Sequence, residues 1–247
     1  MDGRYTMSKA SLQSIFLSIA ILLISTVCGA LIASKLAGGE AGWNYFWFSA
    51  IVSVLIFFSQ LVCYKKARVN LLNQLFYMGF FGFTMVWFML SLFLPVFWMD
   101  TISMLAKAIM LTISVVILSA NVAHGLRSLN QQWQAIGAAT FDQEFKPADS
   151  SVDWDKVVRR MNVSPNVFIP GVPQSWTPVV SVLLIVFMVV GLNLRNALPV
   201  FSVFAWGIPS TVLAGIFLQV SAAYFAQTVN IRAIEKERNV ILKAVGN

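Results

Sequence analysis

Small and polar side chains recur every four residues along one apolar stretch near the end of the chain. They are Gly207, Thr211, Gly215, Gln219, Ala223 and Gln227. Residues four apart share one face of a helix, so this spacing predicts a stripe on an otherwise bulky helix. Small residues let helices approach closely, and amides hydrogen-bond across helices. Two interpretations follow: a packing surface, within a bundle or between sister subunits, or the wall of a water-filled path.

Three further residues bear on both interpretations of this stripe. Pro209 leaves a backbone carbonyl without its helical partner, so we expect a kink near Gly207 that could act as a hinge. Gln60 and Asn121 are amides within other apolar stretches. We expect both amides to be buried and to meet the stripe, because a polar group inside a membrane needs a hydrogen-bond partner.

Lys107 is the one charged residue inside an apolar stretch, which makes it a candidate for a pore or binding role. It also lies about two helical turns from the end of its stretch, where a long side chain can reach the headgroups. Both roles stay open. His124 is the only histidine of the chain. It is expected to be an interfacial residue, because a zinc site needs several nitrogen or sulfur ligands together.

The motifs of the common catalytic and metal sites are absent from the sequence. It contains no HExxH, GxSxG or Walker motif and no pair of acids within its apolar stretches. Cys28 and Cys63 are too few for a disulfide framework or a zinc cluster. The sequence therefore predicts a non-enzymatic protein without a cofactor or metal.

Long apolar stretches must position these residues. The chain has 247 residues, of which 58% are hydrophobic and 11% charged. Soluble domains carry about 25% charged residues, so this chain has too few charged residues to cover a water-facing surface. A spanning helix needs about 20 apolar residues. Six stretches qualify: Leu12–Ser34, Trp43–Tyr64, Leu71–Phe97, Ile102–Ala123, Trp176–Leu194 and Leu198–Val229. The predicted fold is all-α, a polytopic membrane protein with six transmembrane helices.

The distribution of basic residues predicts the orientation. Of the 17 Lys and Arg residues, most lie before the first stretch, between the second and third, between the fourth and fifth, and after the sixth. Cytoplasmic segments are enriched in Lys and Arg, so both termini are expected in the cytoplasm of a bacterium with the chain in its inner membrane. The bases are dispersed and accompany no stacking aromatics, so we expect anionic lipid headgroups and no nucleic acid as their partner.

Four segments follow from this reading: transmembrane helices over 1–123, a cytoplasmic loop over 124–175, two transmembrane helices over 176–230 and a cytoplasmic C-terminal helix over 231–247. Within the loop, the sequence predicts that the fourth helix continues over Gly125–Ala139 and that a second helix, capped by Ser151, covers Val152–Asn162. A proline-rich, extended segment then leads to the fifth span. The C-terminal helix is expected to reach Lys243 and to carry a partner-facing seam of Ile231, Ile234, Ile241 and Val245.

These features favour a protein that acts by binding other membrane proteins or sister subunits, such as an immunity, exclusion, defence or secretion-machine component. The segments 124–175 and 231–247 would offer surfaces to a cytoplasmic partner. The alternative is a small-solute transporter or ion channel subunit that uses the stripe. Its weakness is the near absence of charge within the membrane.

Overall fold

Six long helices dominate the computed structural model, which describes residues 9–67, 70–163, 165–194 and 196–244. Each is long and apolar enough to cross a membrane. They are α1 (Lys9–Ala37), α2 (Gly39–Ala67), α3 (Leu71–Ser91), α4 (Met104–Gln132), α7 (Thr177–Leu194) and α8 (Pro199–Arg238). Six helices of spanning length are confirmed, and the chain is a multi-pass, all-α membrane protein. The third helix ends at Ser91 and not at Phe97, the end of the predicted stretch.

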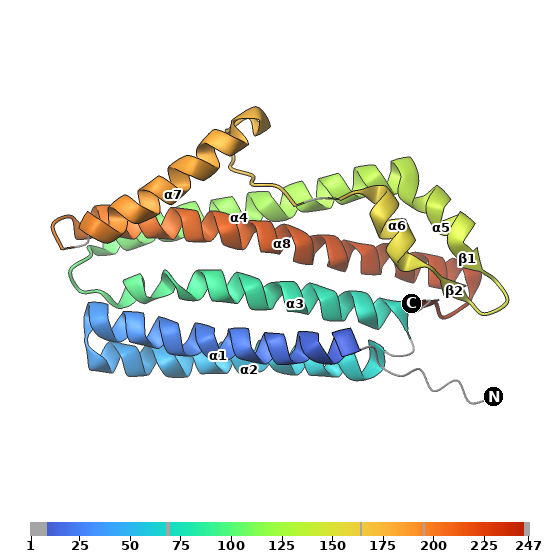
Figure 1. The fold of residues 1–247 in the computed structure, drawn as a ribbon, viewed down its shortest axis with the longest axis horizontal. Helices are drawn as coiled ribbons and strands as arrows, with labels where there is room; N and C mark the ends of the chain where they lie inside the picture. The colour runs from blue at the N-terminus through green and yellow to red at the C-terminus, as the bar shows by residue number, and fades with distance from the viewer. Residues whose placement is uncertain (1–8, 68–69, 164, 195, 245–247) are drawn as a thin grey trace.

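The helices are arranged around α8, against which α3, α4 and α7 all pack (Figure 1). The α1–α2 hairpin covers the other side of α3. The turns between α1 and α2, α3 and α4, and α7 and α8 all lie at one end of the bundle, which we term the turn end. The opposite end, termed the loop end, carries the remaining short elements. Helix α7 is inclined to its neighbours, and its first residues point away from α8.

Local sequence accounts for the turn end. A single residue, Gly38, separates α1 from α2, and its φ of +94° is a conformation that side chains disfavour. The 3-10 helix η1 (Leu94–Trp98) follows α3 and begins beside Pro95, which fits the first turn of a helix. The α1–α2 turn is short because these two helices are packed, antiparallel neighbours. The connection from α3 to α4, residues 92–103, is longer because α8 lies between those two helices.

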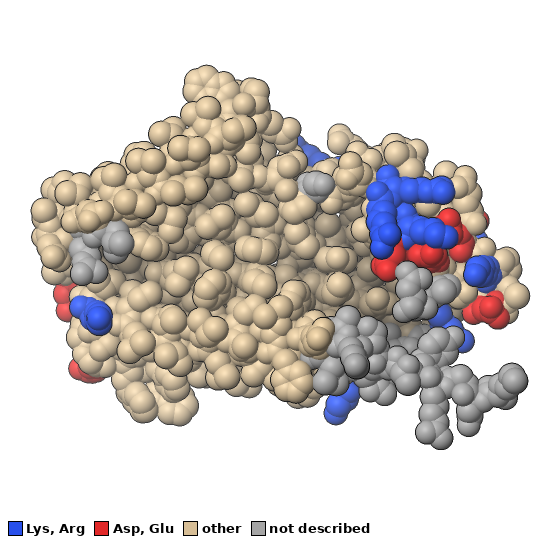
Figure 2. Space-filling model, viewed as in Figure 1, with Lys and Arg blue, Asp and Glu red and all other residues tan. Residues whose placement is uncertain are grey.

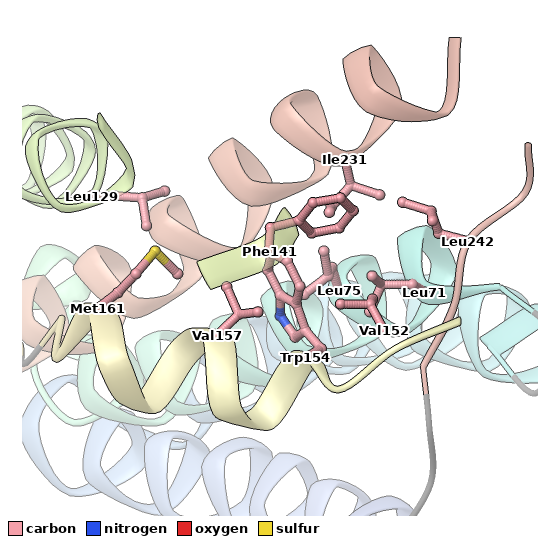
Figure 3. Close-up of a cluster of buried hydrophobic side chains, with 10 residues drawn as sticks. All are labelled: Leu71, Leu75, Leu129, Phe141, Val152, Trp154, Val157, Met161, Ile231 and Leu242. Atoms are coloured by element: carbon pink, nitrogen blue, oxygen red, sulfur yellow. The ribbon is translucent and has the colours of Figure 1, made fainter. Parts of the chain in front are cut away.

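The loop end is a small domain built from two distant parts of the chain. A π-helical turn (η2, Trp133–Gly137) joins α4 to α5 (Ala138–Glu144), and α6 (Trp154–Met161) follows. Three short strands form one sheet: β1 (Phe145–Lys146) is antiparallel to β2 (Ser151–Val152), which is parallel to β3 (Lys243–Ala244). Figure 3 shows the shared core, which consists of Leu71, Leu75, Leu129, Phe141, Val152, Trp154, Val157, Met161, Ile231 and Leu242. Loop and C-terminal segment are therefore held together with α3.

The predicted cap of the loop helix was wrong. Ser151 lies in β2, and the side chain of Asp153 caps α6 by accepting a hydrogen bond from the Lys156 backbone N–H at 3.2 Å. This hydrogen bond lowers the pKa of Asp153, because it stabilises the charged carboxylate. Helix α6 consequently begins at Trp154, two residues later than expected.

The predicted C-terminal helix was too long. Helix α8 ends at Arg238, where Asn239 takes the left-handed conformation, and the chain turns back into β3. The expected seam is divided accordingly: Ile231 is in the core, Ile234 packs against it, and Ile241 is exposed. Val245 lies outside the described residues.

Candidate functional site

The stripe on α8 lies against α4. Five of its residues are buried and Ala223 is partly buried. A Cβ atom added to Gly207 would lie 2.5 Å from Met110 Cε, and one added to Gly215 would lie 2.8 Å from Asn121 Cγ. A side chain at Gly207 would displace the terminal methyl of Met110, and one at Gly215 would displace the hydrogen-bonded Asn121 amide, so glycine at these positions favours close approach of the two helices.

Hydroxyl groups pair within the same interface. The Thr211 and Ser114 hydroxyl oxygens are 3.1 Å apart, and Thr211 also donates to the Gly207 carbonyl at 2.7 Å. Polar groups inside a membrane are expected to be paired in this way. From Gly207 to Gly215 the stripe is thus a closed packing surface.

At Gln219 the stripe meets a third segment, the connector, defined as residues 165–173 between α6 and α7. The Gln219 amide donates to the Asn121 side-chain oxygen and, at 2.8 Å, to the Asn166 carbonyl, and it accepts from the Asn166 N–H at 3.2 Å. Asn121 donates to the Phe168 carbonyl at 3.0 Å. The two buried amides therefore satisfy three backbone groups of a segment that has no helix or strand.

The position of this network explains why it is needed. Gln219 lies 20 residues after Pro199, the first residue of α8, which at 1.5 Å per residue is about 30 Å, the thickness of the hydrocarbon. The connector thus passes the bundle near the hydrocarbon boundary, where an unpaired backbone group costs several kcal/mol. The His124 ring stacks on Phe168 with centroids 4.4 Å apart, which fixes the connector from a second side.

A cavity of about 210 Å³ lies on the loop-end side of this network, between α4, α6 and α8. We term it the α4–α8 cavity. Its polar lining comes from His124, Ser128, Gln219, Tyr224 and Gln227. Gln227 is only 4% exposed, and its Oε1 atom has no hydrogen-bond partner among the described residues. The part of the stripe nearest the loop end, from Gln219 to Gln227, therefore borders a space that can hold water or a small polar molecule.

Gln60 does not meet the stripe, contrary to expectation. Its amide accepts from Ser18 at 2.6 Å and donates to Thr84 and to the Phe80 carbonyl. It therefore ties α1, α2 and α3 together. The physical reason is that α3 lies between α2 and α8, so the α2 amide finds its partners first (Figure 1).

Lys107 and Pro209 lie within regular helix, in α4 and α8. Lys107 lies in the first turn of α4, at the turn end, where it is half-buried and forms no salt bridge or hydrogen bond through its ammonium with a described residue. Helix α8 continues through Pro209 without interruption.

The sequence did not indicate Asn166 and Phe168 as partners of the buried amides. Its one signal was the proline-rich composition of 165–173, which predicted an extended path but not its contacts. Among the described residues, no group of three or more His, Cys, Asp or Glu side chains could hold a metal ion.

A scan against protein-family models finds no match to this chain, and neither do searches of curated proteins and of solved structures.

Proposed function

We propose that the chain is a non-enzymatic protein of a bacterial inner membrane that acts by binding other membrane proteins, as an immunity, exclusion, defence or secretion-machine component. In this proposal both termini and the loop end face the cytoplasm, because most basic residues fall in the segments that meet there. The observation that carries it is one span that the rest of the bundle covers least, with 6% of its apolar part buried against 11% for α2 and 28% or more for the other four.

That span is α7. Only 6% of its apolar span, Gln174–Gly191, is buried. The helix packs mainly on α8, where the absence of a side chain at Gly191 allows Ala205 to come close. Its large exposed side chains include Val179, Val182, Ile185, Val186 and Val189. A helix attached along one side leaves its other sides to lipid or to a partner helix. In the interior, by contrast, α4 and α8 are in close contact where Gly207 meets Met110 and Gly215 meets Asn121.

Photo-crosslinking within the native membrane tests this proposal. A benzophenone amino acid is placed at Ile185 of α7 or, as the matched control, at Leu23 of α1; these side chains are 63% and 61% exposed. We expect a protein adduct at Ile185, identified by mass spectrometry, and only lipid adducts at Leu23. Equal protein adduct yields at both sites would contradict a partner surface on α7.

A small-solute transporter or channel subunit is the second candidate. The α4–α8 cavity favours it, because Gln227 Oε1, which has no partner in the described part of the chain, could accept a hydrogen bond from a solute. Solute flux into liposomes containing the purified chain separates the two. The interaction protein predicts no flux above protein-free liposomes. Flux that disappears in Gln227→Leu would favour transport instead.

A further inference from the structure

A second cavity lies on the other side of Tyr224, between α3, α6 and α8. Its volume is about 280 Å³, and we term it the α3–α6 cavity. Tyr224 and Val158 separate it from the α4–α8 cavity, since they line both. The remaining walls come from Gln74, Leu75 and Met78 of α3 and from Trp154, Asp155 and Arg159 of α6.

This cavity lies where the apolar surface of the bundle ends. Helix α3 begins at Leu71, so Gln74 is in its first turn and Met78 one turn further into the membrane span. Met78 is among the exposed large apolar residues, whereas Asp155 and Arg159 are exposed charges. Figure 2 shows basic and acidic side chains side by side at the loop end, directly beyond the apolar face. In a bilayer, this is the level of the phospholipid headgroups.

The two charged residues that line the cavity differ from their neighbours on α6 in their lack of a paired side chain among the described residues. Lys156 forms salt bridges with Glu144 and Asp153, both at 3.3 Å, and Arg160 donates to Gln143 at 2.8 Å. Asp155 and Arg159, one helical turn apart, form neither a salt bridge nor a side-chain hydrogen bond with a described residue. The loop end thus leaves one carboxylate and one guanidinium available at the same cavity.

A buried donor lies in the same wall. Trp154 is 5% exposed, and its indole N–H has no hydrogen-bond partner among the described residues. Buried donors are paired in the great majority of folded proteins. Because Trp154 lines the α3–α6 cavity, a ligand oxygen that enters beside the indole N–H would supply that partner.

We propose that the α3–α6 cavity binds a phosphoethanolamine headgroup, supplied by a zwitterionic phospholipid of the surrounding leaflet. The Arg159 guanidinium pairs with the phosphodiester, and the Asp155 carboxylate accepts hydrogen bonds from the primary ammonium. The Gln74 amide and the Trp154 indole donate to phosphate or ester oxygens. The acyl chains follow the exposed side of Met78 into the hydrocarbon. An anionic headgroup without an amine would meet Asp155 unpaired, and a quaternary ammonium would offer it no N–H.

Native mass spectrometry of the purified full chain in detergent, titrated with dioleoyl lipids, tests the proposal. We expect phosphatidylethanolamine to be retained more than phosphatidylglycerol or phosphatidylcholine. Arg159→Gln should lower ethanolamine-lipid retention about fivefold, as for loss of one basic contact at a membrane surface. Asp155→Asn should abolish the preference for ethanolamine over glycerol headgroups.

Arg160→Gln is the matched control, because Arg160 lies on the same helix but does not line the cavity. It should retain the wild-type lipid pattern, with circular dichroism establishing that every variant is folded. Equal loss in Arg159→Gln and Arg160→Gln, or an unchanged lipid preference in Asp155→Asn, would overturn the site.

Soluble glycerophosphoethanolamine, added at millimolar concentration, distinguishes the source of the headgroup. We expect it not to displace the bound lipid, because it lacks the acyl chains that lie along Met78. Displacement that depends on Asp155 and Arg159 would overturn the membrane source and assign the cavity to a soluble phosphodiester.

Discussion

Individual side chains decide how closely α4 and α8 pack. Gly215 is buried directly against Asn121, and Asn121 in turn bonds Gln219. A change at one of these three residues therefore affects the other two. The four-residue spacing of the stripe was readable from the sequence, because it is a property of a single helix. The identity of each partner was not, because Gln219 meets Asn166 from 53 residues away.

Replacing Gly215 with leucine tests this contact. The new side chain would have to enter space occupied by the Asn121 amide, and overpacking of this kind typically costs ~1–3 kcal/mol. We expect Gly215→Leu to lower the thermal unfolding midpoint of the detergent-solubilised protein. Leu218→Phe, at a partly exposed position of the same helix, should change it little. Equal midpoints for Gly215→Leu and the wild type would show that the helices can separate at no cost.

Lys107 permits a second test at this scale. Its position in the first turn of α4 lets the ammonium reach the headgroups at the turn end. If the residue only snorkels, Lys107→Met should leave function intact and stability equal or higher, because a costly charge is removed. Function lost in a variant that accumulates and unfolds normally would assign Lys107 to a pathway or binding role.

At the scale of elements, the connector depends on α4 and α8 for its backbone hydrogen bonds. The sequence predicted the spans well, because their apolar length is set by the membrane. It predicted helix ends less well: Asp153 replaced Ser151 as the cap, and α8 stopped at Arg238. Several acids, hydroxyls and amides near a helix end can serve as caps, and the tertiary contacts that select one involve residues far apart in the chain.

Removing the Gln219 amide should release the connector. Gln219→Leu leaves the Asn166 N–H and carbonyl without their partner, and each unsatisfied buried group lowers stability by ~1–3 kcal/mol. We expect faster hydrogen–deuterium exchange over 165–173, measured by mass spectrometry. Gln60→Leu is the matched control, since it removes a buried amide that bonds only α1 and α3. It should lower overall stability without a selective effect on the connector, and a similar exchange pattern in both variants would contradict the role of Gln219.

For the whole molecule, the sequence and the fold carry different information. Apolar length and spacing predicted six helices, and the structure assembles them with three turns at one end and the small domain at the other. The contact between loop and C-terminal segment could not be foreseen, because β2 and β3 are short and about 90 residues apart in the chain, with no pattern of their own. The geometry is the same whichever way the bundle is inserted, so the orientation rests on the basic residues.

Reporter fusions test that orientation across the whole chain. Fusions after Arg68, which lies outside the described residues, and after Arg160 and Lys243 should give a cytoplasmic signal; fusions near Gly39 and Asn196 should give an exterior one. The reason is that Lys and Arg near the ends of spans are retained on the cytoplasmic side. Arg160 is the decisive position, because it lies on α6 in the loop-end domain that also holds the last turns of α8. An exterior signal there would show that the chain is inserted in the opposite orientation. The α3–α6 cavity would then face the outer leaflet of the membrane.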